Sequence, residues 1–148
     1  MLVFRINWLI RILAAAIILF ITTHHSLAHQ EHLVGDSIWS IPTSNAFYSN
    51  WANNRSFTVG DTLVFRFEMG FYDVVQVSRR EFDDCTAGNP FRSFDVGPAS
   101  VRLNEEAMHY FICSFGNYCL LGMKLPVPAH RLQPPPINSS PDSPLPPT

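Results

Sequence analysis

One short segment holds the residues whose types and spacing could do chemistry. Cys113, Cys119 and Met123 lie within eleven residues of one another, around a Gly-Asn turn. Sulfur ligands gathered on one turn between two strands are typical of a blue-copper site, in which two imidazoles, a thiolate and a distant methionine bind copper. The residue before Cys119 is Tyr118, not histidine. The segment therefore has the arrangement of an electron-transfer copper site and lacks an imidazole that such a site needs.

The three cysteines predict one disulfide and one free thiol if the chain is secreted. Cys113 and Cys119 flank the turn too closely to bridge easily. Pairing Cys85 with Cys119 would close a loop of roughly 35 residues, which stabilises a fold by about 3–4 kcal/mol through chain entropy. Cys113 would then be free, and a buried free cysteine commonly acts as a small apolar residue. On the residues alone, a core role and a ligand role for Cys113 both stay open.

The elements that position these residues are predicted to be strands. Residues 62–68 place Leu63, Phe65 and Phe67 on one face, the two-residue period of a half-buried strand. Further stretches are rich in β-branched or aromatic residues and are bounded by turn residues, namely 73–77, 99–103 and 107–113.

Turn signals recur along the chain at the spacing of an all-β sandwich. They are the pairs Gly35-Asp36, Gly60-Asp61, Asn89-Pro90, Gly97-Pro98 and Gly116-Asn117. Two stretches, 48–53 and 80–84, have helical character and are expected to form short surface helices. The predicted fold class is all-β with short helical turns.

The two ends of the chain differ from the middle. Arg5 and Arg11 precede an apolar run of about ten residues and a small-residue site ending at Ala28, the layout of a secretory signal. The run is too short to span a bilayer comfortably, so a signal anchor is the less favoured alternative. Nine of the twelve prolines lie from Pro126 onward, in a segment expected to be extended and to join no ladder. The predicted organisation is a signal at 1–28, a domain at 29–127 and a Pro/Ser-rich tail at 128–148.

Charge and motifs exclude several classes of function. The formal charge is −2, and loss of the two signal arginines would make it −4, which argues against nucleic-acid binding. The sequence shows no paired carboxylates, nucleophile–base set or phosphate loop, so an enzyme is not expected. Sequons predict glycosylation at Asn54 and at Asn138, the second weakened by a following proline.

The order and spacing of several motifs resemble those of the plant phytocyanins, a family of secreted cupredoxins. The resemblance covers nearly the whole predicted domain and implies a Greek-key β-sandwich of the cupredoxin type, with Cys85–Cys119 as its one disulfide. The motifs are Val34-Gly-Asp, Trp39, Tyr48, Trp51-Ala, Phe57-x-Val-Gly-Asp-x-Leu-x-Phe, Asp73-Val-Val-x-Val, Cys85 with Asn89-Pro, Tyr110-Phe-Ile-Cys and Cys119-x-x-Gly-Met-Lys.

The resemblance also implies where the family's copper ligands fall. The thiolate falls on Cys113 and the axial thioether on Met123, whereas the two imidazoles fall on Tyr72 and Tyr118. A phenol has a pKa of about 10 and gives a hard oxygen donor, so it is a poor substitute for imidazole. These four residues are therefore predicted to be vestigial copper positions, and no metal or other cofactor is expected.

Other histidines are poor candidates to complete a copper site. His109 lies about 13 Å along an extended strand from Cys113. His29 and His32 would stand near the new N-terminus, where they could bind cupric ion adventitiously.

Phytocyanins without the histidines resemble the early nodulin-like group, which implies a copper-free protein of the plant cell surface. The expected function is a binding or structural module of the arabinogalactan type, secreted to the apoplast or the outer face of the plasma membrane. The expected partner is a cell-wall polysaccharide or a cell-surface protein, with no nucleic acid and no transmembrane span in the mature chain. The alternative is a type 1 blue-copper protein that transfers one electron.

Overall fold

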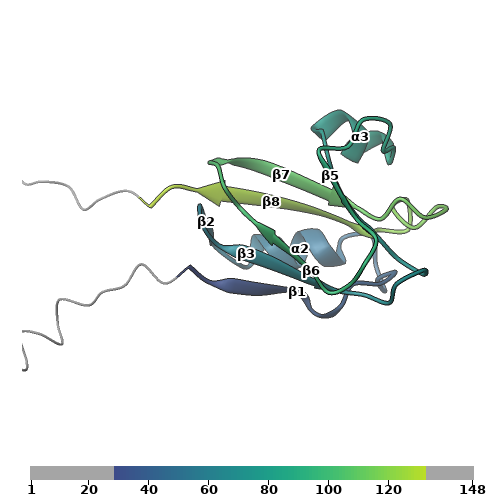
Figure 1. Cartoon of the computed structure of the whole chain (residues 1–148), viewed down its shortest axis with the longest axis horizontal. Helices are drawn as coiled ribbons and strands as arrows, with labels where there is room; N and C mark the ends of the chain where they lie inside the picture. The colour runs from purple at the N-terminus through teal and green to yellow at the C-terminus, as the bar shows by residue number, and fades with distance from the viewer. Residues whose placement is uncertain (1–28, 133–148) are drawn as a thin grey trace, which may run out of the picture.

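Residues 29–132, the part described by the computed structural model, form two sheets that face each other across one core (Figure 1). The predicted signal at 1–28, Asn138 and most of the tail lie outside the described residues. One sheet has the order β1-β3-β6, formed by Glu31–Ile38, Thr62–Arg66 and Ala99–Arg102. The other has the order β2-β8-β7-β4-β5, formed by Phe57–Thr58, Lys124–His130, Ala107–Ile112, Val74–Val77 and Arg92–Phe94. The pairs β1–β3 and β2–β8 are parallel, and the remaining pairs are antiparallel.

The predicted all-β sandwich is confirmed, and its strands form where apolar residues alternate. In β3, Leu63 and Phe65 are fully buried and Arg66 is exposed. Phe65 meets Trp39 with ring centroids 5.2 Å apart and Phe111 with centroids 5.4 Å apart. Aromatic rings from β3 and β7 therefore join the two sheets, and their burial is a main source of stability.

Helix α2 (Phe47–Asn53) confirms the helical turn predicted at residues 48–53. It packs against β8 and β1 at the side of the sandwich (Figure 1). Its inward side is a stripe spaced three and four residues apart, as expected of an amphipathic helix. The stripe consists of Tyr48, Trp51 and Ala52.

Helix α3 (Arg79–Asp84) confirms the second predicted helical turn, at residues 80–84, and packs against β7. A capping box starts it. The Ser78 hydroxyl accepts a hydrogen bond from the Glu81 N–H, and the Glu81 carboxylate accepts one from the Ser78 N–H. Residues 29–132 contain the helices α2 and α3, and neither of them is long and apolar enough to cross a membrane.

Strand β8 shows that one prediction was wrong: the chain from Pro126 onward does join a ladder. The strand continues to His130 and pairs with β7 along its length. Pro126 and Pro128 lie opposite Tyr110 and Met108, at alternate positions of the ladder. Because the N–H groups that the two prolines lack would point to the same side of the strand, the N–H of Val127 between them points to the other side and can still form a ladder bond.

The predicted turn at Gly35-Asp36 was also wrong, because both residues lie inside β1. Their φ angles are 68° and 57°, and the pairing with β3 shifts register between Leu33 and Ile38. A Cβ on Gly35 would come within 2.9 Å of the Tyr48 ring. The glycine therefore serves a bulge in the strand and a close approach to α2.

Candidate functional site

The residues predicted from the copper pattern come from two loops and meet in the structure. Tyr72 lies two residues before β4, whereas Cys113, Tyr118 and Met123 belong to the segment between β7 and β8. The rings of Tyr72 and Tyr118 have centroids 5.8 Å apart. Both half-buried rings pack against the core cluster that contains the buried Cys113 and Met123. We call these four residues the tyrosine–sulfur cluster.

Asp73 connects the two loops that carry the cluster. Its Oδ1 accepts a hydrogen bond of 2.7 Å from the Ser114 N–H, and its Oδ2 accepts one from the Ser114 hydroxyl. Its carbonyl oxygen accepts a bond of 2.9 Å from Trp39 Nε1. Because Asp73 follows Tyr72 and Ser114 follows Cys113, these bonds hold the two cluster segments together. This role of Asp73 was not predicted from the sequence, although an acidic residue beside an apolar strand motif was a signal for it.

The segment between β7 and β8 is closed by its own backbone and by a disulfide. The Cys113 N–H donates to the Met123 carbonyl at 3.0 Å, and the Met123 N–H donates to the Tyr118 carbonyl at 3.0 Å. The predicted disulfide between Cys85 and Cys119 is confirmed, with a Cα–Cα distance of 5.6 Å. The bridge attaches this segment to the end of α3, so the segment has a covalent support that does not depend on a metal.

Cys113 is the free cysteine of the described residues, and it is 1 % exposed. Burial raises the pKa of its thiol to about 11, although the N–H groups of Asp73 and Phe115 act in the opposite direction. The thiol is therefore protonated at neutral pH, whereas a metal ligand or nucleophile must be a thiolate.

The donor set of the tyrosine–sulfur cluster does not fit a blue-copper ion. It offers one thiol, one thioether and two phenols, and the two imidazole nitrogens that complete such a site are missing from the cluster. Within residues 29–132 no group of three or more His, Cys, Asp or Glu side chains is placed to hold a metal ion.

His32 and His109, which the sequence offered as alternative copper ligands, contact other polar groups in the structure. His32 was expected near a free N-terminus, but it is buried in β1, where its Nε2 lies 3.0 Å from Asp61 Oδ2. His109 is buried on β7, and its two ring nitrogens contact Gln76 and the main chain of Glu105. These imidazoles therefore stabilise the fold at other places than the cluster.

Asn54, the predicted glycosylation site in the described residues, is exposed at the C-terminal end of α2. Its side-chain nitrogen donates a bond of 2.9 Å to the Asn50 carbonyl. Glycosylation at this position stays a prediction.

The sequence profile of the plastocyanin-like domain matches residues 39–123. The chain is 37% identical over 99 residues to a blue copper protein of Arabidopsis thaliana, covering 66% of this chain and 50% of that protein. It is 34% identical over 88 residues to early nodulin-like protein 14 of the same plant, covering 59% and 48%. The chain thus spans about half the length of these relatives.

A solved structure, cucumber stellacyanin with Cu²⁺, superimposes with a TM-score of 0.66 at 35% sequence identity. The match covers 72% of this chain and all of the stellacyanin chain. The matched residues 39–123 include all four residues of the tyrosine–sulfur cluster. The chain belongs to the family of plastocyanin-like domains, as a member of the phytocyanins.

Proposed function

We propose that this chain is a copper-free phytocyanin that acts as a binding or structural module. The observation that carries the proposal is the tyrosine–sulfur cluster, in which the rings of Tyr72 and Tyr118 lie 5.8 Å apart and pack against the buried core that contains Cys113 and Met123. In this proposal the two tyrosines stand at the positions of the family's copper imidazoles and fill the space of two rings and a metal. Similarity to proteins named early nodulin-like supports this assignment.

Exposed apolar side chains beside the cluster support a binding role. Met69 and Phe71 lie in the loop before Tyr72, and Leu120 lies in the loop after Tyr118; each is at least 60 % exposed. Exposed large apolar side chains on the loops that carry the cluster favour an interaction surface at this end of the molecule. The proposed partner is a cell-wall polysaccharide or a cell-surface protein, met in the apoplast or at the outer face of the plasma membrane. The proposal includes no catalytic step.

The alternative function is one-electron transfer by type 1 copper. It is favoured by the retention of both sulfur residues, Cys113 and Met123, in one buried cluster, and by the relatives named blue copper proteins. That function requires nitrogen ligands from outside the cluster.

A spectroscopic titration with cupric ion tests the proposal. The full chain from a secreting host is titrated with Cu²⁺, and we expect no intense visible band of thiolate-to-copper charge transfer. The Cys113→Ser variant is the matched control, because it removes the thiolate and keeps the size of the side chain. A visible band in the natural protein that disappears in Cys113→Ser would overturn the copper-free assignment.

A further inference from the structure

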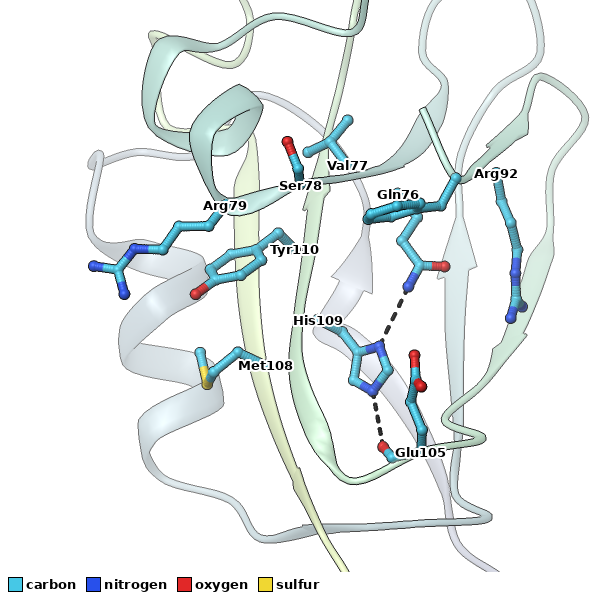
Figure 2. A pocket seen from close by; sticks show the side chains of 10 residues that line it. Gln76, Val77, Ser78, Arg79, Arg92, Glu105, Met108, His109 and Tyr110 are labelled. Carbon is cyan, nitrogen blue, oxygen red and sulfur yellow. Dashed lines mark hydrogen bonds between the residues drawn. The ribbon is translucent and has the colours of Figure 1, made fainter. Parts of the chain in front are cut away.

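Strand β7 extends beyond the end of its neighbour β4, and a polar cavity of about 450 Å³ lies where β4 stops (Figure 2). The pairing of β4 with β7 runs as far as Val77, which lies opposite Tyr110, and the chain then enters α3. β7, in contrast, begins at Ala107, so Met108 is the next residue of the same phase as Tyr110. Within residues 29–132 no strand pairs with Met108 on the β4 side, and Met108 forms part of the cavity wall.

The pairing on the other side of β7 shows where the main chain of Met108 points. Met108 lies opposite Pro128 of β8, and a proline has no N–H to donate to β7. At the same phase of β8, the His130 carbonyl accepts a hydrogen bond of 2.9 Å from the Val59 N–H, next to β2. The main-chain groups of Pro128 and His130 therefore point toward β2, and Met108 and Pro128 form a non-hydrogen-bonded pair. The N–H and C=O of Met108 consequently point away from β8, toward the cavity.

These two main-chain groups of Met108 have no hydrogen-bond partner in the part of the chain that the structure describes. An N–H and a C=O that stand unpaired at a strand edge form a template for a further strand. A residue that pairs with Met108 in an antiparallel strand supplies both an acceptor and a donor. The edge therefore favours an extended peptide over a saccharide as its ligand.

The side chains around Met108 define which residue would pair with it. Figure 2 shows Arg79 and Met108 on one face of the sheet, whereas the buried pair of Gln76 and His109, with nitrogens 3.2 Å apart, lies on the opposite face. Directly paired residues share a face, so the side chain that pairs with Met108 would lie beside Arg79. The ion pair of Arg79 with Asp83 is exposed and long, at 3.7 Å, so it competes weakly for the guanidinium group. A glutamate suits this position, because its methylene groups can contact Met108 and its carboxylate can pair with Arg79.

We propose that this end of β7 binds an extended segment of a partner protein, which adds a short strand at Met108 and places a glutamate beside Arg79. This inference rests on the proposed binding function and assigns it a protein partner instead of a polysaccharide. The residues on either side of the glutamate would point to the opposite face. Arg92 and Glu105 carry opposite charges on that face of the cavity, so neutral side chains suit these two positions.

Amide hydrogen exchange of the full, ¹⁵N-labelled chain, measured by NMR, tests whether the strand edge is free. We expect the Met108 amide to exchange at least about 100-fold faster than the Tyr110 amide, which points the same way but has β4 as its neighbour. Equal protection of the two amides would show that Met108 is already paired and would overturn the proposal.

A titration of the same sample with the peptide acetyl-Val-Thr-Glu-Thr-Val-amide tests the ligand. We expect saturable shifts centred on Met108 with a Kd of about 1 mM or lower. At ten times the Kd, the peptide should slow exchange of the Met108 amide by about tenfold. The same peptide with an N-methylated glutamate lacks the main-chain donor and should bind at least about fivefold more weakly. Absence of saturable shifts, equal binding of the methylated peptide, or tighter binding of galactotriose at the same amides overturns the proposal.

Matched variants assign the binding to this edge. Arg79→Gln is expected to raise the Kd of the peptide about threefold. Arg80→Gln is the control, because Arg80 has the same kind of exposed pair, with Asp84 at 3.8 Å, but does not line the cavity. An equal effect of Arg80→Gln would show general charge attraction and overturn the site. Met108→Pro removes the unpaired N–H and is expected to abolish binding; the N-methylated peptide keeps the test decisive if this variant fails to fold.

Measuring copper binding on the same samples separates this inference from the proposed function. A colourless protein that does not bind the peptide contradicts the strand-edge site and leaves the copper-free assignment standing. A blue protein that binds the peptide at Met108 contradicts the copper-free assignment and leaves the strand-edge site standing.

Discussion

The rings of Tyr72 and Tyr118 lie with centroids 5.8 Å apart and planes inclined by 47°, although one precedes β4 and the other follows β7. Asp73 and Ser114, the residues next to Tyr72 and Cys113, hold these two chain segments together. These bonds hold Tyr72 close to Cys113, the arrangement on which the proposed copper-free site depends.

The double variant Tyr72→His/Tyr118→His is expected to bind Cu²⁺ and turn blue. The two imidazoles would join the Cys113 thiolate and Met123, which completes the ligand set of a type 1 site. Absorption and electron paramagnetic resonance spectra after Cu²⁺ addition measure the result. The single variants are the controls, because one imidazole leaves the trigonal plane incomplete. A colourless double variant with a native fold would contradict the assignment of these positions.

The stability of the protein is expected to fall as the pH rises from 9 toward about 11. Burial raises the pKa of Cys113 from 9.0 to about 11, so in this range the unfolded chain loses the thiol proton while the folded chain keeps it. The stabilisation is fully present below pH 9 and declines above it, by about 2–3 kcal/mol in all. Urea unfolding across this range, compared with Cys113→Ala, measures the effect. Equal slopes for the two proteins would show that Cys113 does not contribute.

Removal of the disulfide in Cys85→Ala/Cys119→Ala is expected to lower the free energy of unfolding by about 3–4 kcal/mol. The bridge joins residues 34 positions apart, and its loss returns chain entropy to the unfolded state. Thermal unfolding followed by circular dichroism measures the change. Reduction of the natural protein should produce a similar loss, whereas Cys113→Ala, which leaves the bridge intact, should keep the response to reductant.

Substitution of Asp61 by alanine is expected to destabilise the fold by about 2–4 kcal/mol, because it leaves buried donors without an acceptor. The carboxylate is 3 % exposed and accepts bonds of 2.9 Å from the N–H groups of Thr58 and Gln30, and it lies 3.0 Å from His32 Nε2. Chemical denaturation at neutral pH measures the loss. Asp83→Ala, at an exposed position, is the matched control and should change stability by about 0.5 kcal/mol or less.

Asp61 also predicts how the protein responds to acid. Burial alone would raise the pKa of Asp61, but hydrogen bonds from Thr58, Gln30 and His32 outweigh it and hold the pKa below the usual 3.8. The folded state therefore prefers the carboxylate, and this stabilisation is present above pH 3.8 and lost as the pH falls through the lower folded pKa. The stability difference between the natural protein and Asp61→Asn should shrink over that range. A difference independent of pH would contradict the role of the charge.

Much of the fold could be predicted from the sequence, because its causes are local. Alternation in residues 62–68 marked a strand, and the helical turns near Tyr48 and Arg80 were found where the structure has α2 and α3. Predictions from local sequence were wrong where the structure of a segment depends on the strand with which it pairs. Gly35 and Asp36 read as a turn but form a bulge inside β1, and Pro126 and Pro128 read as a tail but fit the phase of the β7–β8 ladder.

The sequence by itself determined which donors the chain possesses: the order of Tyr72, Cys113, Tyr118 and Met123 already implied sulfur without imidazole at the family's copper positions. Only the tertiary structure decided how those side chains meet, because contacts between residues far apart in the chain depend on sheet register and loop closure. The same holds for the Gln76–His109 pair, which joins β4 to β7 and leaves one acceptor buried in a cavity wall. Neither residue belongs to a motif, so only the packing of two strands could show that they act together.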